Sequence, residues 1–143
     1  MNRGASDWLR AGEAFCLLIA ARLALAVLPV QVILRSLRLT MEPAGEAQMD
    51  KKAAATARAV GLAVQRAARR LPLETRCLHI ALAGAVMLHR RRIQATMVLG
   101  VRSKDGLLKA HAWLLSAGAP VLGAAGARSF VPLAAFSSRP EKA

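Results

Sequence analysis

Cysteine and histidine are the residue types here that are best suited to covalent chemistry, and the chain has only two cysteines and three histidines. Cys77 falls in the first turn of an expected helix, and His111 falls in a later expected strand. A thiol attacks as the thiolate, which a helix N-terminus and a neighbouring imidazole both favour. A lone cysteine is more often an inert core residue. The spacing by itself therefore indicates a candidate Cys–His pair and nothing more specific.

Two kinds of element must position this pair. The helix carrying Cys77 is expected from Thr75 to about Arg91, with the threonine as its N-cap. His111 is expected in the second strand of a hairpin. The alternating runs Ala95–Val101 and Leu108–Leu115 flank a turn that contains an Asp-Gly pair, which is a strong hairpin signal.

Several short motifs around these residues occur in a fixed order. They are Arg70–Leu78 (RLPLETRCL), Ala81–Ala83 (ALA), Met87–Ala95 (MLHRRRIQA), Leu99–Val101 (LGV) and Ala110–Trp113 (AHAW). The series resembles the transglutaminase-like cysteine proteases of lasso peptide biosynthesis, the B2 proteins, which remove the leader from a ribosomal precursor. The resemblance extends over nearly the whole chain, from the apolar N-terminal segment to the ending Phe130–Phe136.

This resemblance implies a papain-like fold in which Cys77 is the nucleophile. It also implies that His111 is the general base and later the acid that protonates the leaving amine. The family often adds an aspartate shortly after the histidine to orient the imidazole, but Pro120–Gly126 holds no carboxylate. The acidic residue that follows His111 is Glu141, in the tail, which we expect not to be catalytic. The third catalytic member is therefore unknown: a backbone carbonyl, a hydroxyl or amide side chain, or a water could take that place.

The resemblance also implies the setting of the reaction. The substrate would be a lasso precursor peptide, and a separate leader-recognition protein of the B1 type would grip the leader. An asparagine-synthetase-like cyclase is a further candidate partner. No cofactor, no metal and no nucleic acid are expected, and backbone N–H groups at the helix start, including that of Cys77, would form part of the oxyanion hole. The expected location is cytoplasmic, with membrane association as an open alternative.

The overall pattern predicts an α+β fold of the papain/transglutaminase-like type, with helices first and a small antiparallel sheet after Gln94. A chain of 143 residues, 55% of them hydrophobic, fits one domain with a sizeable core. We expect that domain over residues 1–143. It would comprise apolar helices and a loop over 1–52, a catalytic core over 53–136, and a tail over 137–143.

The most apolar stretch runs from Glu13 to Leu39 and is long enough to suggest a membrane helix. Arg22 lies near its middle, where a charge is costly in lipid, and Pro29 interrupts the pattern. The stretch therefore predicts two buried helices, Ala14–Leu28 and Val30–Leu39, with membrane contact as the alternative.

The chain is strongly basic. Its 21 Lys and Arg against 8 Asp and Glu give a net charge of +13 and a pI of about 11.7. An anionic partner would explain this charge, and an Arg- and Ala-rich coding bias is the other explanation. Ala53–Arg70 predicts a basic amphipathic helix. A competing interpretation is thus a non-enzymatic membrane-surface or nucleic-acid-binding protein, although 3% aromatic residues argue against a single-strand reader. A third interpretation keeps the fold for an acyl-transferring enzyme.

Other residues have structural interpretations. Trp113 is expected in the core or as a wall of the substrate groove beside the pair. Arg90–Arg92 would be either a solvated helix end or a contact for an acidic peptide. Cys16 is interpreted as a packing residue and Trp8 as a local anchor, and Gly123–Arg128 is expected as a small, flexible stretch.

Overall fold

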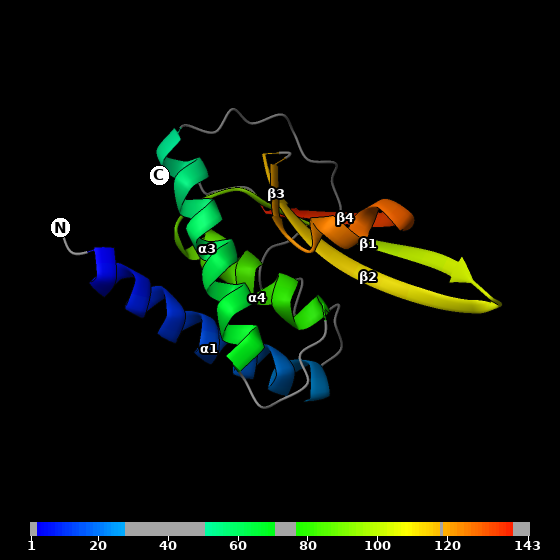
Figure 1. Cartoon of the computed structure of the whole chain (residues 1–143), viewed down its shortest axis with the longest axis horizontal. Helices are drawn as coiled ribbons and strands as arrows, with labels where there is room; N and C mark the ends of the chain where they lie inside the picture. The colour runs from blue at the N-terminus through cyan, green and yellow to red at the C-terminus, as the bar shows by residue number, and fades with distance from the viewer. Residues whose placement is uncertain (1–2, 28–50, 71–76, 118, 139–143) are drawn as a thin grey trace.

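The computed structural model describes residues 3–27, 51–70, 77–117 and 119–138. In this part of the chain the helices come first and the strands last (Figure 1). The helices are α1 (Arg3–Val27), α3 (Lys51–Arg70) and α4 (Cys77–Arg90), and the strands are β1 (Ala95–Lys104), β2 (Leu107–Ser116), β3 (Ala119–Leu122) and β4 (Val131–Ser138). The predicted α+β fold, with its sheet beginning after Gln94, is confirmed.

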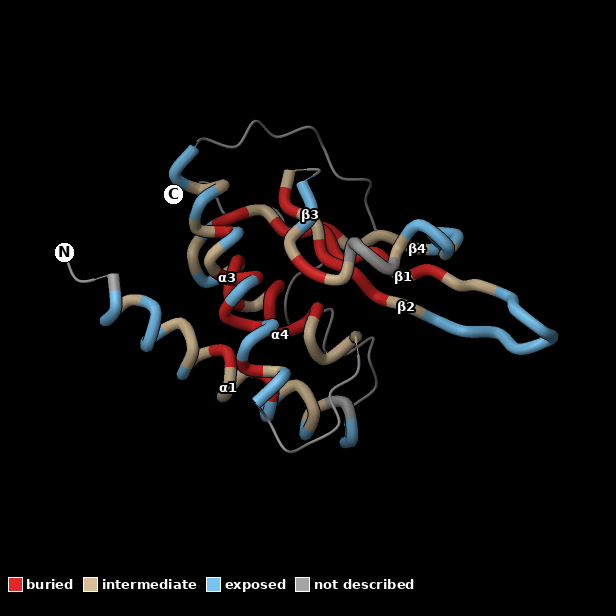
Figure 2. The backbone as a smooth tube through the Cα atoms, viewed as in Figure 1, coloured by how far each residue is buried: buried red, intermediate tan, exposed pale blue. Residues whose placement is uncertain are grey.

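The four strands form one antiparallel sheet in the order β3-β2-β1-β4. The predicted hairpin is present, with Lys104 paired to Leu107 and Asp105 and Gly106 left as the two-residue loop. Both loop residues have positive φ, 54° and 76°, as a type I′ turn requires, and Asp-Gly tolerates that conformation. The hairpin tip projects from the rest of the molecule and is exposed (Figure 2).

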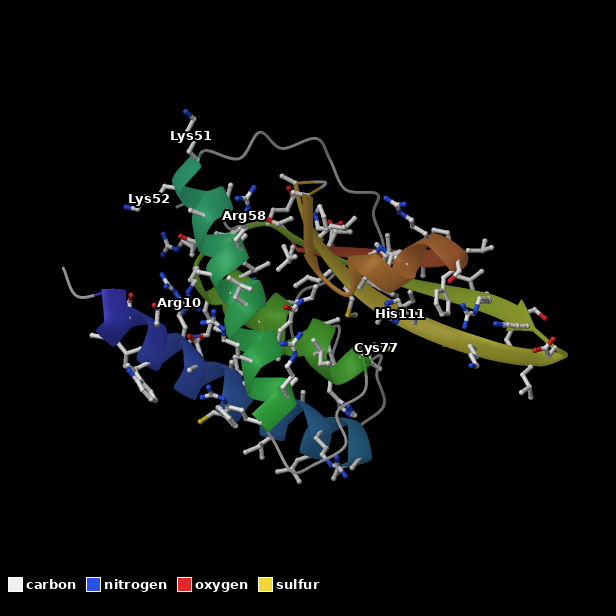
Figure 3. All side chains as sticks on the ribbon, in the orientation of Figure 1. Arg10, Lys51, Lys52, Arg58, Cys77 and His111 are labelled. Carbon is white, nitrogen blue, oxygen red and sulfur yellow. The ribbon has the colours of Figure 1, made fainter. Side chains whose placement is uncertain are left out.

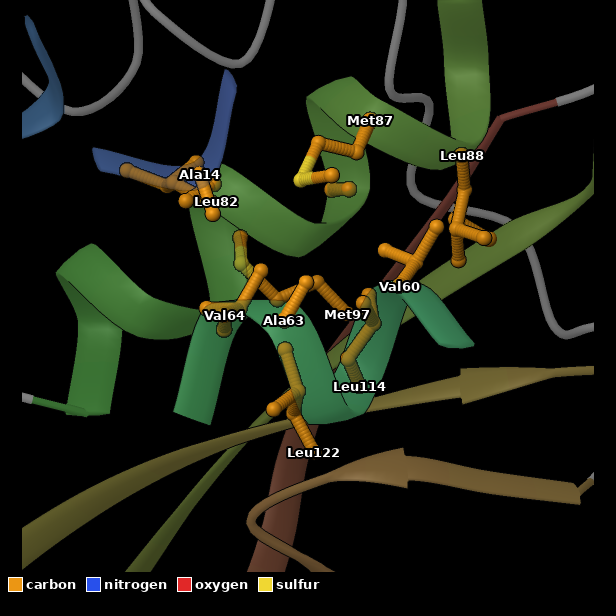
Figure 4. Packing of buried hydrophobic residues seen from close by; sticks show 14 of the residues in the cluster. Ala14, Val60, Ala63, Val64, Leu82, Met87, Leu88, Met97, Leu114 and Leu122 are labelled. Atoms are coloured by element: carbon orange, nitrogen blue, oxygen red, sulfur yellow. The ribbon is translucent and has the colours of Figure 1, made fainter. Parts of the chain in front are cut away.

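The helices cover the sheet through a shared hydrophobic core. α4 packs against β1, β2 and β3, α3 packs against β3, and α1 packs against α3 and α4. The basic amphipathic helix predicted from the sequence is confirmed as α3, because the predicted inner residues Val60, Ala63, Val64 and Ala67 are all buried. They meet Leu82, Met87 and Leu88 of α4 and Met97, Leu114 and Leu122 of the sheet (Figure 4). This core fixes α4, whose first residue is Cys77.

The N-terminal helix differs from its prediction. α1 begins at Arg3, not at Ala14. Its side chains Ala14 and Leu18 are fully buried, whereas Trp8 is 76% exposed, so the expected anchoring by Trp8 is wrong.

Cys16 is likewise exposed, which corrects its expected packing role. Positions 14 and 18 lie one turn apart on the helix face that contacts the core, and position 16 lies about 200° round from position 14. The expected helix Val30–Leu39 lies outside the described residues. Among the described helices, none has both the length and the hydropathy needed to cross a bilayer.

The arginines at the end of α4 bind α1. Arg91 forms a two-pronged contact with Glu13, through Nη2 to Oε2 at 2.6 Å and Nη1 to Oε1 at 3.1 Å, and Arg90 Nη1 donates to Oε1 at 2.7 Å. Burial raises the pKa of Glu13, but the hydrogen bonds and charges of Arg91 and Arg90 outweigh it, so the pKa lies below its ordinary value of 4.5. Two of the three arginines therefore fasten α1 to α4, and neither alternative expected for them describes that role.

Candidate active site

Cys77 lies at the start of α4, beside the open part of the β2 edge. β3 pairs with β2 only along Leu114–Ser116, so the backbone of Ala112 extends beyond the end of that short strand. The amide N–H of Ala112 instead donates to Cys77 Sγ at 3.4 Å. A thiolate accepts such a bond more strongly than a thiol does. The helix start and the strand edge thus hold the sulfur beside the backbone of Ala112, the residue that follows His111 in β2. Figure 3 labels Cys77 on α4 and His111 on β2.

The imidazole ring of His111, a residue of β2, is oriented by a backbone carbonyl. Its Nε2 lies 2.9 Å from the carbonyl oxygen of Gly123. A carbonyl oxygen only accepts hydrogen bonds, so in the neutral imidazole the proton is assigned to Nε2 and the lone pair to Nδ1. This is the tautomer that leaves Nδ1 free to take a proton from a thiol.

Gly123 occupies its position for a steric reason. It follows β3 directly, with a φ of 72° that disfavours any residue with a Cβ. A Cβ placed there would lie 3.1 Å from the carbonyl oxygen of Ala112 and 3.2 Å from the Cβ of Trp113. The chain then enters η1, a 3-10 helix over Ala124–Ser129. The stretch expected to be small and flexible therefore contains a turn and a 3-10 helix, and the Gly123 carbonyl at its start faces His111.

Two aromatic rings support the imidazole. Trp113 stacks on it with 5.8 Å between ring centroids and an interplanar angle of 24°. Phe130, which follows η1, lies 5.1 Å away at 33°. The two rings pack against the imidazole and hold its plane in one orientation. Trp113 itself is only 6% exposed, which makes it a buried support for His111.

The residues predicted for the site lie on two neighbouring elements, α4 and β2. Cys77 Sγ lies 3.4 Å from the backbone nitrogen of Ala112, the residue after His111, and the imidazole of His111 stacks on Trp113. In the described part of the chain, His111 has the Gly123 carbonyl as its hydrogen-bond partner and no ion pair with a carboxylate. The contact of Phe130 with His111 was not predicted, because the local sequence does not show that η1 returns the chain to β2. Glu141 lies outside the described residues.

Taken together, these contacts provide the parts of a nucleophilic site. The sulfur lies where the first amide N–H groups of α4 lack intrahelical acceptors, which is where an oxyanion would be stabilised. The imidazole has a fixed tautomer and two aromatic supports. Such a set can attack a carbonyl carbon and move one proton between the nucleophile and a leaving group.

Comparison with known proteins identifies the family of this chain. A family model described as the transglutaminase-like superfamily matches residues 15–135, which include α3, α4, all of β1 to β3 and both Cys77 and His111. The comparison with curated proteins gives no match, and neither does the comparison with solved structures. The family match covers most of the chain, and the chain belongs to the transglutaminase-like superfamily.

Proposed function

We propose that this chain is a cysteine peptidase that removes the leader from a ribosomally made lasso precursor peptide. The observation that carries the proposal is the placement of Cys77 Sγ 3.4 Å from the Ala112 amide, next to an imidazole whose Nε2 faces the Gly123 carbonyl. The transglutaminase-like superfamily contains cysteine peptidases and transglutaminases, and both attack a carbonyl through a thiolate. The motif resemblance to lasso leader peptidases favours the peptidase and names its substrate.

The first step forms an acyl-enzyme. Nδ1 of His111 takes the proton of the Cys77 thiol, and the sulfur attacks the scissile carbonyl carbon. The amide N–H groups at the start of α4 stabilise the resulting oxyanion. The C–N bond then breaks as the imidazolium returns the proton to the leaving amine, which leaves a thioester on Cys77.

The second step consumes water. His111 takes one proton from a water molecule, whose oxygen attacks the thioester carbon, and the proton then passes to the departing sulfur. The Gly123 carbonyl keeps Nε2–H in place in both steps, and Trp113 and Phe130 hold the plane of the imidazole ring. The positioning group we propose for the third member is therefore a backbone carbonyl.

The proposed reaction needs partners. A separate leader-recognition protein of the B1 type presents the leader, and an asparagine-synthetase-like cyclase takes the freed core peptide. The proposed location is the cytoplasm, where a ribosomal precursor is first available. No metal or cofactor takes part in the two steps proposed above.

The test is a reconstituted cleavage assay with precursor and recognition protein, read by mass spectrometry of leader and core. Cys77→Ala and His111→Ala should each abolish cleavage and leave the circular dichroism spectrum unchanged. Cys16→Ala is the matched control and should retain most activity, because Cys16 is exposed on α1. Iodoacetamide inactivation that follows alkylation of Cys16 and spares Cys77 would refute the assignment.

The same assay separates a hydrolase from an acyl-transferring enzyme. Adding a small primary amine offers an alternative acceptor for the acyl group on Cys77. A peptidase should still release mainly the free carboxylate at the new leader terminus. Release chiefly of the amide would assign the site to acyl transfer.

A further inference from the structure

A groove of about 430 Å³ lies between α1 and α3. None of the described residues that line it belongs to α4 or to the sheet. In Figure 3 the labelled Arg10, on the groove, lies well apart from Cys77 and His111. The volume of the groove falls in the range of binding pockets, about 300–1,000 Å³. The proposed peptidase mechanism uses no part of it.

The walls of the groove are apolar and leave two large side chains in solvent. Trp8 of α1 is 76% exposed and Leu62 of α3 is 51% exposed. The apolar lining also includes Phe15 and several small side chains, among them Ala63 and Ala67. An exposed tryptophan beside a concave apolar surface is typical of a site that a partner covers, since aromatic anchors are enriched at interfaces.

Positive charge surrounds these walls. Arg10, Arg66 and Arg70 line the groove, with Asp7 as the acidic residue among its described lining. Asp7 pairs with Arg10 at 3.2 Å, whereas Arg66 and Arg70 form no ion pair with any residue that the structure describes. These two arginines are four residues apart, so their side chains emerge one turn apart on the same side of α3. α3 has six basic side chains and no acidic one.

We propose that this groove binds an acidic amphipathic helix of a polypeptide partner. Two carboxylates one turn apart on that helix match the spacing of Arg66 and Arg70, and its apolar side chains cover Trp8 and Leu62. A groove between two helices is the shape that accepts a third helix through its apolar face. A lipid surface presents anions without such spacing and does not enter a groove. The proposal does not depend on the peptidase activity.

The test uses a synthetic helical peptide of about 15 residues, long enough to form a helix in part. It carries glutamates and leucines at i,i+4 spacing, and a second peptide replaces each glutamate by glutamine. Binding to the full-length Cys77→Ala chain is measured by fluorescence anisotropy. Tryptophan emission gives a local readout, because Trp8 is exposed while Trp113, the other tryptophan, is only 6% exposed.

The glutamate peptide should bind saturably and shift tryptophan emission to the blue, and the glutamine peptide should bind at least about tenfold more weakly. Arg66→Glu with Arg70→Glu should weaken binding at least about tenfold. The matched control is Arg58→Glu with Arg69→Glu, which changes the charge of α3 equally at exposed positions outside the groove lining. This control should change the affinity by less than about threefold, since charges outside an interface act mainly through screened long-range attraction.

Three results would overturn the proposal. Absence of saturable binding by the glutamate peptide is the first. Equal weakening by the two double variants is the second, because it would mean attraction to net charge alone. The third is failure of the peptide to bind while phosphatidylglycerol vesicles capture the chain through Arg66 and Arg70, which would make this surface a membrane site. Leu62→Ala, which removes no charge, should weaken peptide binding and keeps the test valid if a double variant misfolds.

Discussion

Gly123→Ala is expected to lower the cleavage rate, because it strains the backbone at residue 123 and displaces the carbonyl that faces the imidazole of His111. The φ of 72° costs a residue with a Cβ about 1–2 kcal/mol, and the new methyl group would lie 3.4 Å from Nε2 of His111 and closer still to Ala112 and Trp113. Relief of these contacts moves the Gly123 carbonyl away from the imidazole. A neutral hydrogen bond contributes about 1 kcal/mol, so the cleavage rate should fall roughly fivefold. Loss of an orienting carboxylate from a serine triad costs far more, about 10⁴-fold.

Gly106→Ala is the matched control. Gly106 also has positive φ, 76°, but a Cβ there would meet nothing within 4 Å. Both variants should lose about 1–2 kcal/mol of unfolding free energy, measured by urea denaturation, and only Gly123→Ala should lose cleavage rate at a temperature where both are folded.

Two outcomes would refute the reasoning. Cleavage by Gly123→Ala at the rate of the Gly106→Ala variant would show that the carbonyl does not orient His111. A fall in cleavage rate as large as that caused by removing a triad carboxylate would show that another group holds the imidazole and is displaced by the same change.

Three further changes test other parts of the structure. Glu13→Gln should lower the unfolding free energy by about 1–3 kcal/mol at neutral pH. Arg91 lowers the pKa of Glu13, so the carboxylate stabilises the fold only while it is ionised. The difference in unfolding free energy between the unmodified chain and the variant should therefore be complete above pH 4.5 and disappear as the pH falls below that value. Denaturation measured across pH checks this. Gly100→Ala would place a Cβ 2.8 Å from the indole of Trp113, so it should cost about 1–3 kcal/mol and lower the cleavage rate more than it changes KM; an unchanged rate would show that the Trp113 stack is dispensable. Deletion of residues 139–143 should change the cleavage rate by less than about tenfold, and a loss equal to that of His111→Ala would mean that the tail supplies a catalytic group.

The sequence by itself determined several of the elements and pointed to Cys77 and His111 as the candidate pair. The alternation of Ala95–Val101, the Asp-Gly turn, and the periodicity of Ala53–Arg70 are properties of neighbouring residues, so they predicted the hairpin and α3 correctly. Cys77 could be placed at a helix start for the same reason. The motifs around it and around His111 then indicated the transglutaminase-like superfamily, which the comparison shows.

Only the tertiary structure decided what surrounds that pair. The group that faces Nε2 depends on where β3 ends and how the chain turns at Gly123, and a backbone carbonyl has no residue type by which a sequence could reveal it. Phe130 reaches His111 through η1, a path that local periodicity does not encode. Which face of α1 meets the core was equally undetermined, because apolar residues lie around much of that helix. Packing against α3 and α4 buried Ala14 and Leu18 and left Trp8 and Cys16 in solvent.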